Sequence, residues 1–226
     1  MTAIASAWTE QPYAVWHLDD DTRRAARASF DRLPDDPYVP SGWRARRLTR
    51  WVLGPGTERT TLSPRAVWQT KAHNARFGDL PRSFAPLEDD WATSGELDRL
   101  VATFRAALPE PVDGWILWGH QIRTRWRPGG VLPPADGPHR DERVYLAIAV
   151  FDVVGIEAGT TRLLAAPEGP ALFERPLRAG DVLLFDDERL WHETRMPPQG
   201  GPGHRDVMLL AVTRHERDGV PPEPRR

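Results

Sequence analysis

The 226-residue chain contains no cysteine at all. This absence excludes disulfides, thiolate catalysis and zinc or iron–sulfur sites with cysteine ligands. Histidine and carboxylate side chains would therefore have to hold any transition metal. The chain also lacks an apolar run of about 18 residues, the length of a membrane span, and residues 1–16 lack the basic and apolar stretches of a secretion signal. We therefore expect a cytoplasmic protein with no membrane segment.

An excess of charge of one sign is missing too. The 30 lysine and arginine residues and the 32 acidic residues are interspersed and give a net charge of −2. No basic face is therefore expected to bind nucleic acid or an anionic membrane. Hydrophobic residues make up 40 % of the chain, an ordinary fraction for a globular protein. We expect one domain that acts on a small molecule or on another protein, and the oligomeric state stays open.

The distribution of helix and strand signals predicts a mainly β domain of the α+β class. Amphipathic helices are predicted at 21–33 and 96–108, with a strand at 47–53 between them. Short strands separated by glycine turns follow Pro111, at 115–127, 143–154, 160–165, 181–185 and 206–213. Such strands favour a sandwich or barrel. The predicted single domain has a helical and irregular part at 1–111, an antiparallel β-core at 112–215 and a disordered tail at 216–226.

A short motif, His-x-Asp, offers metal ligands. Two histidines and one carboxylate form the facial triad of non-haem Fe(II) sites, and its sequence trace is His-x-Asp followed by a distant histidine. At a strand end, residues i and i+2 can reach one metal because side chains alternate. Three such motifs occur, at His17/Asp19, His139/Asp141 and His204/Asp206. Because so short a motif arises by chance, its surroundings must decide.

Two of the three motifs have weak surroundings. Asp19 begins an acidic run before the first predicted helix, where carboxylates cap the helix and favour its dipole. His204 and Asp206 open the last predicted strand, and only His215 lies beyond them. We therefore expect neither motif to bind metal.

The motif at His139 and Asp141 has the strongest surroundings. It lies between a proline- and glycine-rich loop and the most apolar predicted strand. Two later turns lead to His192 near the start of another strand, which can return this histidine to the first pair. A hydrogen-bonded structural histidine beside Trp191 is the alternative for His192. The order of the elements favours His139, Asp141 and His192 as metal ligands.

Arg205 adds a second kind of site. It follows His192 by thirteen positions and begins the apolar strand DVMLLAVT. A dicarboxylate cosubstrate that chelates iron through its keto acid needs a fixed cation for its far carboxylate, and arginine offers a planar fork for bidentate binding. An exposed charge at a sheet edge is the alternative. The order of His-x-Asp, Gly-Asp turn, histidine, arginine and strand favours the cosubstrate site.

From about Trp118 to Arg214 the chain resembles the 2-oxoglutarate/Fe(II) dioxygenases, and more closely the bacterial family of L-isoleucine 4-hydroxylase and related free-amino-acid hydroxylases. The matching blocks are Gln121–Thr124, His139–Asp141 with the preceding loop, Leu177–Asp187, His192 and His204–Asp206. The resemblance implies a double-stranded β-helix (jelly-roll) core backed by N-terminal helices. It also implies Fe(II) as cofactor, 2-oxoglutarate and O2 as cosubstrates, and release of succinate and CO2.

The resemblance also implies roles for individual residues. His139, Asp141 and His192 match the iron ligands, and Arg205 matches the residue that pairs with the distal carboxylate of 2-oxoglutarate. The strand motif with Gln121 and Arg123 implies cosubstrate or substrate binding, or else an ordinary strand with one exposed arginine. Hydroxylation of the side chain of a small free L-amino acid is the expected reaction, although desaturation or ring closure would use the same site.

Two departures from the family pattern concern the substrate. Glu142 stands where these hydroxylases often have glycine, and Gly155–Gly159 replaces an Asn-Ile-x-Gly-Gly turn. Glu142 is a candidate partner for a substrate ammonium group, or else a solvent-facing loop residue. Arg123, Arg125 and Arg127 alternate on one face of a strand, which points either into the barrel or to solvent.

Two other functions stay open on the sequence alone. A cupin-type jelly roll, either an isomerase or a ligand-binding module, would use the same three metal ligands without 2-oxoglutarate and without Arg205. A protein-interaction domain with a degenerate site would use some of the ten tryptophans as contact residues.

Overall fold

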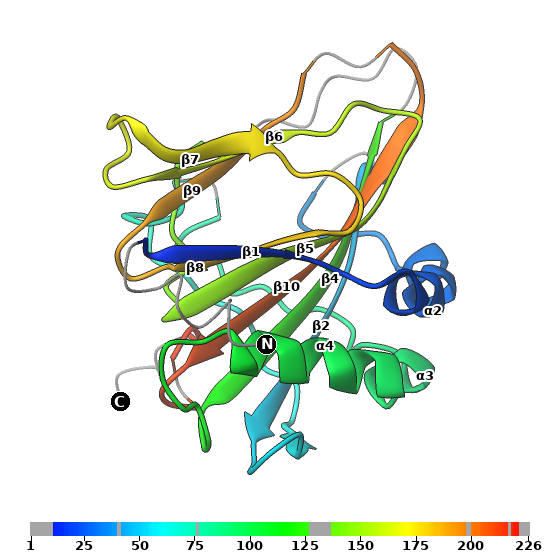
Figure 1. Ribbon diagram of the computed structural model, residues 1–226, viewed down its shortest axis with the longest axis vertical. Coiled ribbons are helices and arrows are strands. Elements are labelled where there is room, and N and C mark those ends of the chain that lie inside the picture. The colour runs from blue at the N-terminus through cyan, green and yellow to red at the C-terminus, as the bar shows by residue number, and fades with distance from the viewer. Residues whose placement is uncertain are drawn as a thin grey trace.

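The computed structural model describes residues 11–39, 42–75, 77–126, 137–197, 200–216 and 218–221, and these residues form two antiparallel sheets and three helices (Figure 1). The helices are α2 (Asp20–Asp31), α3 (Asp89–Ala92) and α4 (Gly95–Ala106). The large sheet contains β1 (Tyr13–His17), β2 (Arg44–Leu53), β3 (Arg59–Thr61), β4 (Ile116–Trp126), β5 (Tyr145–Val154), β8 (Asp181–Asp186) and β10 (Gly203–Thr213). The small sheet contains β6 (Thr160–Leu164), β7 (Ala171–Pro176) and β9 (Trp191–Arg195).

The strand order is that of a jelly roll. It runs β1-β8-β5-β10-β4-β2-β3 in the large sheet and β7-β6-β9 in the small sheet. Figure 1 shows the small sheet over one face of the large sheet, with α3 and α4 on the other side. The predicted mainly β, α+β fold class is therefore confirmed, with a jelly-roll core backed by helices.

The large sheet uses strands from both sides of the predicted boundary at residue 111. β2 pairs with β4, and β1 pairs with β8. The strand predicted at 47–53 is thus part of β2 and of the core, whereas β1, β3 and β7 were not predicted. β1 is only five residues long, and β2 carries four arginines, which obscure the alternation of polar and apolar residues that identifies a strand. Residues 1–111 are therefore not only helical and irregular.

The end of the chain is partly packed. The carbonyl of Gly219 accepts a hydrogen bond from the N–H of Trp68 at 2.9 Å, and Val220 packs against the core. The predicted disordered tail at 216–226 stays a prediction, and its residues 217 and 222–226 lie outside the described residues. No helix in the described ranges is both long and apolar enough to cross a membrane.

Two apolar cores flank the large sheet. α2 begins after Asp19, whose carboxylate accepts the N–H of Thr22 at 2.7 Å, as the predicted cap requires. The apolar sides of α2 and α4 pack on the outer face of the large sheet and bury Phe30 and Phe104. The second core lies between the two sheets. β4, β5 and β10 are therefore covered on both faces, and residue alternation decides which side chains reach the space between the sheets.

Candidate active site

A cavity of about 200 Å³ is lined by the large sheet, by the irregular segment 67–82, by the loop 137–143 and by β9. Alternate residues of β4 and β10 reach it, and they include His120 and Ile122 on β4 and Arg205 and Val207 on β10. The candidate metal ligands His139, Asp141 and His192 also line this cavity.

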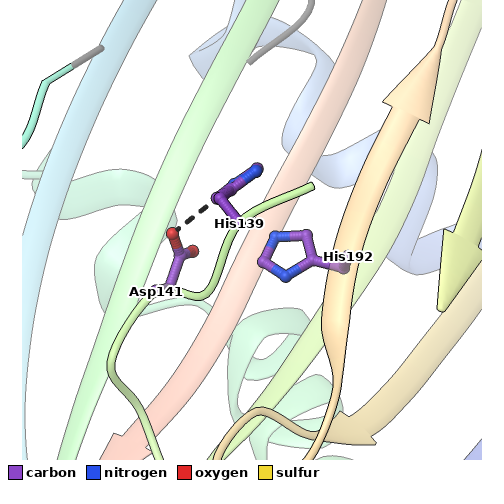
Figure 2. A group of neighbouring side chains, drawn as sticks. All are labelled: His139, Asp141 and His192. Carbon is purple, nitrogen blue, oxygen red and sulfur yellow. Dashed lines mark ion pairs between the residues drawn. The ribbon is translucent and has the colours of Figure 1, made fainter. Parts of the chain in front are cut away.

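The three predicted metal ligands meet at one point (Figure 2). Their ligand atoms all lie within 4.8 Å of one another, and Nε2 of His139 is 3.8 Å from Oδ1 of Asp141. His139 and Asp141 lie in the loop before β5, and His192 lies on β9. The backbones of His139 and His192 exchange two hydrogen bonds of 3.0 and 2.9 Å. The small sheet therefore returns His192 to the His-x-Asp pair.

Hydrogen bonding gives His139 the tautomer that a metal ligand needs. Its Nδ1 lies 2.9 Å from the carbonyl oxygen of Gly137. This oxygen can only accept, so the Nδ1 proton is donated to it and the lone pair of Nε2 faces Asp141 and His192. Partners of this kind fix the ring orientation of metal-binding histidines.

Gln69 orients the carboxylate of Asp141. Its Nε2 donates to Oδ1 of Asp141 at 2.8 Å. Its Oε1 accepts from Arg82 at 2.8 Å and from Asn74 at 3.2 Å, which fixes the direction of the amide. The sequence carries no signal for this role, because Gln69 lies in an irregular segment about 70 residues before the motif.

Asp187 contacts both the loop that carries Asp141 and the third ligand, His192. Its buried carboxylate accepts the N–H of Asp141 at 3.0 Å and that of Arg143 at 2.9 Å. Oδ1 of Asp187 also lies 3.5 Å from Nδ1 of His192. The sequence marked Asp187 only as a turn residue, although it closes one of the blocks that match the hydroxylases.

We expect Asp187→Asn to weaken Fe(II) affinity about ten- to a hundredfold, the usual effect of removing a group that orients metal ligands. Asparagine keeps one acceptor oxygen but has no charge, so the loop and His192 lose part of their shared anchor. Anaerobic Fe(II) titration by calorimetry measures the change. Asp186→Asn is the matched control, because Asp186 caps an exposed turn through the N–H of Arg189. Equal affinity in the two variants would remove the anchoring role.

Charges in the cavity keep Asp141 ionised and His120 neutral. Burial alone would raise the pKa of Asp141, but its electrostatic interactions with His192, then with His139 and Arg143, outweigh burial and hold the pKa well below its usual range. Burial, followed by the charge of Arg46, lowers the pKa of His120 well below 6.5. A cation would therefore meet one anionic oxygen ligand and two imidazole nitrogens.

Arg205 points a buried cation into the cavity. The residue is 9 % exposed, and its Nε and Nη2 have no hydrogen-bond partner among the described residues. Burial lowers the pKa of its guanidinium to about 10, so it stays charged at neutral pH. A buried charge without a partner destabilises a fold unless a ligand compensates it. The surroundings of Arg205 therefore favour an anion.

Gln121 and Arg123 lie on the opposite face of β4. Oε1 of Gln121 accepts the hydroxyl of Ser29 on α2 at 3.1 Å. Arg123 binds Asp206 through Nε and Nη2, both at 2.7 Å, and Asp31 through Nη1 at 2.8 Å. We therefore correct the predicted binding role of Gln121 and Arg123 and place both at the contact between α2 and the sheet. Asp206, from the third His-x-Asp motif, is already paired there.

Glu142 does not line the cavity within the described residues. Its φ of 57° lies in the left-handed region, which explains why glycine suits this position. Its carboxylate accepts the N–H and hydroxyl of Thr70 and lies 2.6 Å from Nδ1 of His73. Burial alone would raise the pKa of Glu142, but these bonds lower it. The side chain is engaged away from a substrate ammonium group, contrary to the sequence-based suggestion.

The remaining candidate site residues from the sequence do not line the cavity where the structure describes them. Arg125 pairs with Asp35 at 2.7 Å on the face that carries Arg123, and Arg127 is outside the described residues. The side chain of His17 is 62 % exposed and lies 3.6 Å from Asp181. Neither His17 nor Asp19 lines the cavity.

Comparison with known proteins agrees with this site. The 2OG-Fe dioxygenase family model matches residues 27–211. A BsmA homolog from Methylobium petroleophilum PM1 superposes with a TM-score of 0.75 at 23 % identity, over 93 % of this chain and 92 % of that one. IDO from Bacillus thuringiensis has a TM-score of 0.72 at 13 % identity, over 93 % and 94 % of the two chains. The Fe(II)/α-ketoglutarate-dependent dioxygenase TqaL has a TM-score of 0.67 at 12 % identity, over 99 % and 92 %. No curated protein sequence matches.

These comparisons differ in what they show. The solved structures share the fold, whereas the family model covers most of the chain, including the triad and Arg205. Two imidazoles and a carboxylate are the ligand set of facial-triad Fe(II) sites, so the residues present fit the metal that this family uses. The family also uses 2-oxoglutarate and O2, which excludes the cupin-type and interaction-domain alternatives. The chain belongs to the 2OG-Fe dioxygenase family.

Proposed function

We propose that this dioxygenase hydroxylates the side chain of a small free L-amino acid, with iron held by His139, Asp141 and His192. The observation that carries the proposal is one cavity in which the triad shares its lining with the buried guanidinium of Arg205, whose Nε and Nη2 have no hydrogen-bond partner among the described residues. Such a cation suits the distal carboxylate of 2-oxoglutarate, because guanidinium binds a carboxylate in a bidentate manner.

The residues bind and orient, and the bound groups perform the oxidation. Fe(II), 2-oxoglutarate and O2 together supply the oxidation of an unactivated C–H bond, with release of succinate and CO2. Gln69 and Asp187 hold the ligands in place, and Arg205 fixes the far end of the cosubstrate. Apolar side chains of β5 and β10, such as Ile148 and Leu209, line the cavity and limit the entry of water.

Three features support a small aliphatic amino acid. The cavity of about 200 Å³ lies below the usual range of ligand pockets, which favours a small group at the reacting position. Its lining combines polar groups at the triad with apolar side chains that include Ile122, Leu146 and Val207. The matching sequence blocks also resemble those of free-amino-acid hydroxylases.

A substrate screen tests the proposal. We expect at least one aliphatic L-amino acid, among the proteinogenic and common non-proteinogenic ones, to raise succinate release above the rate without substrate. The assay contains Fe(II), ascorbate and 2-oxoglutarate, and the product should gain the mass of one oxygen. Asp141→Ala protein provides the blank. Activity confined to a peptide, a carrier-bound acyl group or a terpenoid would reject the substrate class and leave the dioxygenase assignment intact.

A further inference from the structure

The described lining of the cavity carries more positive charge than the binding of Fe(II) and 2-oxoglutarate requires. Its arginines are Arg44, Arg46, Arg82, Arg143 and Arg205. Asp141 is the one acidic side chain among the described lining residues. Fe(II) would add two positive charges and 2-oxoglutarate two negative charges, so together they leave this balance unchanged. A further anion would therefore still meet positively charged lining residues when both are bound.

Three of these arginines have other contacts. The guanidinium of Arg44 lies 5.2 Å from the centre of the Trp43 ring. Arg143 lies near carboxylates that include Asp187 and Glu142, and its guanidinium stacks at 4.3 Å on the ring of Trp118. Arg82 donates to Gln69 at 2.8 Å and so belongs to the support of the triad. None of these contacts engages Arg46.

Arg46 is buried but only partly satisfied. It is 7 % exposed, and its guanidinium lies 4.4 Å from the centre of the Phe84 ring. Nη2 donates to Nδ1 of His120, whereas Nε has no hydrogen-bond partner among the described residues. Because arginine can only donate, Nδ1 of the neutral His120 is the acceptor and its proton is on Nε2. His120 is therefore a positioning residue that fixes the guanidinium of Arg46.

The electrostatic surroundings of Arg46 also call for an anion. Burial, and then the charges of Arg82 and Arg44, lower the pKa of its guanidinium to about 9. The charges of Asp36 and Asp141 act in the opposite direction but do not offset this. The group still carries its charge at neutral pH, in a site that disfavours it.

Arg46 and Arg205 are separate sites. They lie on β2 and β10, the two strands that flank β4. Neighbouring strands are about 4.8 Å apart, so the two backbones are about 10 Å apart. A cosubstrate that engages the iron ligands and Arg205 therefore leaves Arg46 for another ligand.

We propose that Arg46 binds the carboxylate of the primary substrate, so that this dioxygenase selects small carboxylic acids. The inference rests on the proposed function in one respect, since it assigns Arg205 to 2-oxoglutarate. A neutral substrate would leave Arg46 as an uncompensated buried charge. The guanidinium of Arg46 presents donors in a planar fork that suits a carboxylate.

The test uses an isosteric pair of probes, isobutyrate and its neutral amide, isobutyramide. The protein is loaded with Mn(II) and saturated with 2-oxoglutarate, and each probe is titrated by calorimetry. We expect isobutyrate to bind the wild type at least tenfold more tightly than isobutyramide. Arg46→Met should lose about ten- to a hundredfold in isobutyrate affinity, as expected for a charge-assisted hydrogen bond, and Arg46→Lys should recover part of it. Arg47→Met is the matched control, because Arg47 neighbours Arg46 on β2 but binds Pro86 and Glu88 outside the cavity.

Several results would overturn the inference. They are no isobutyrate binding to the wild type, equal binding of the two probes, and equal isobutyrate affinity in wild type and Arg46→Met. The affinity for 2-oxoglutarate, measured in the same samples, tests the proposed function separately and shows that Arg46→Met is folded. If 2-oxoglutarate fails to bind while isobutyrate binding still depends on Arg46, the cosubstrate assignment fails and the role of Arg46 stands.

Discussion

Replacement of His139 or Asp141 by alanine should abolish turnover and weaken Fe(II) binding by more than about a hundredfold, the upper end of the effect of outer partners such as Asp187. His139 offers the lone pair of Nε2, and Asp141 is the one carboxylate of the cluster. Alanine removes a ligand without disturbing the backbone bridge between His139 and His192. Iron content after anaerobic reconstitution and succinate release measure the two effects.

The controls for this experiment are histidines outside the cavity. His17→Ala and His215→Ala should keep normal iron content and activity, because both side chains are exposed. His17 also belongs to a His-x-Asp motif, so it controls for the motif itself. Normal iron content and activity in His139→Ala would reject the assignment of the metal site.

The candidate triad was predictable because its geometry is mostly local. His139 and Asp141 are two residues apart, and a strand that begins at Trp191 brings His192 back to them. Asp19 was likewise predictable as a cap, since a cap depends on the following turn of helix. Such features follow from spacing along the chain.

The faces of β4 were not predictable, because both sides of this strand are covered. Alternation places Gln121 and Arg123 on the same face, but a strand buried on both faces has no apolar or polar side that identifies the interior. Their pairing with Ser29 and Asp206 depends on where α2 packs, which spacing along β4 does not determine.

The sequence of β2 shows a second limit on predicting buried positions. Its sequence, RARRLTRWVL, looks like a charged surface segment, yet Arg46 and Arg50 are buried. Buried arginines are uncommon in ordinary cores because desolvation penalises the charge. Arg46 lines the cavity, and the anion-binding role proposed for it would account for its burial. Arg50 does not line the cavity, and its guanidinium lies 4.9 Å from the centre of the Trp118 ring.

Replacement of Arg205 should weaken the binding of 2-oxoglutarate more than any other single substitution outside the metal ligands. Arg205→Ala should raise the KM for 2-oxoglutarate about ten- to a hundredfold, since a hydrogen bond to a charged group contributes about 1.5–3 kcal/mol. The KM for the primary substrate should change far less, because Arg46 and Arg205 lie on different strands. Arg205→Lys should recover only part of the loss, since lysine lacks the planar fork.

Stability gives an independent measure of the same role. Without ligand, Arg205→Met should unfold at a higher temperature than the wild type, because an apolar side chain of similar length replaces a buried charge that has no ion-pair partner within the described ranges. With Fe(II) replaced by Mn(II), 2-oxoglutarate should raise the Tm of the wild type, as any ligand of the folded state does, and raise that of the variant much less. Differential scanning calorimetry with and without 2-oxoglutarate gives both values. If Arg205→Met and the wild type respond equally to 2-oxoglutarate, the pairing role would move to Arg44, which lies across Thr124 from Arg205 and also lines the cavity.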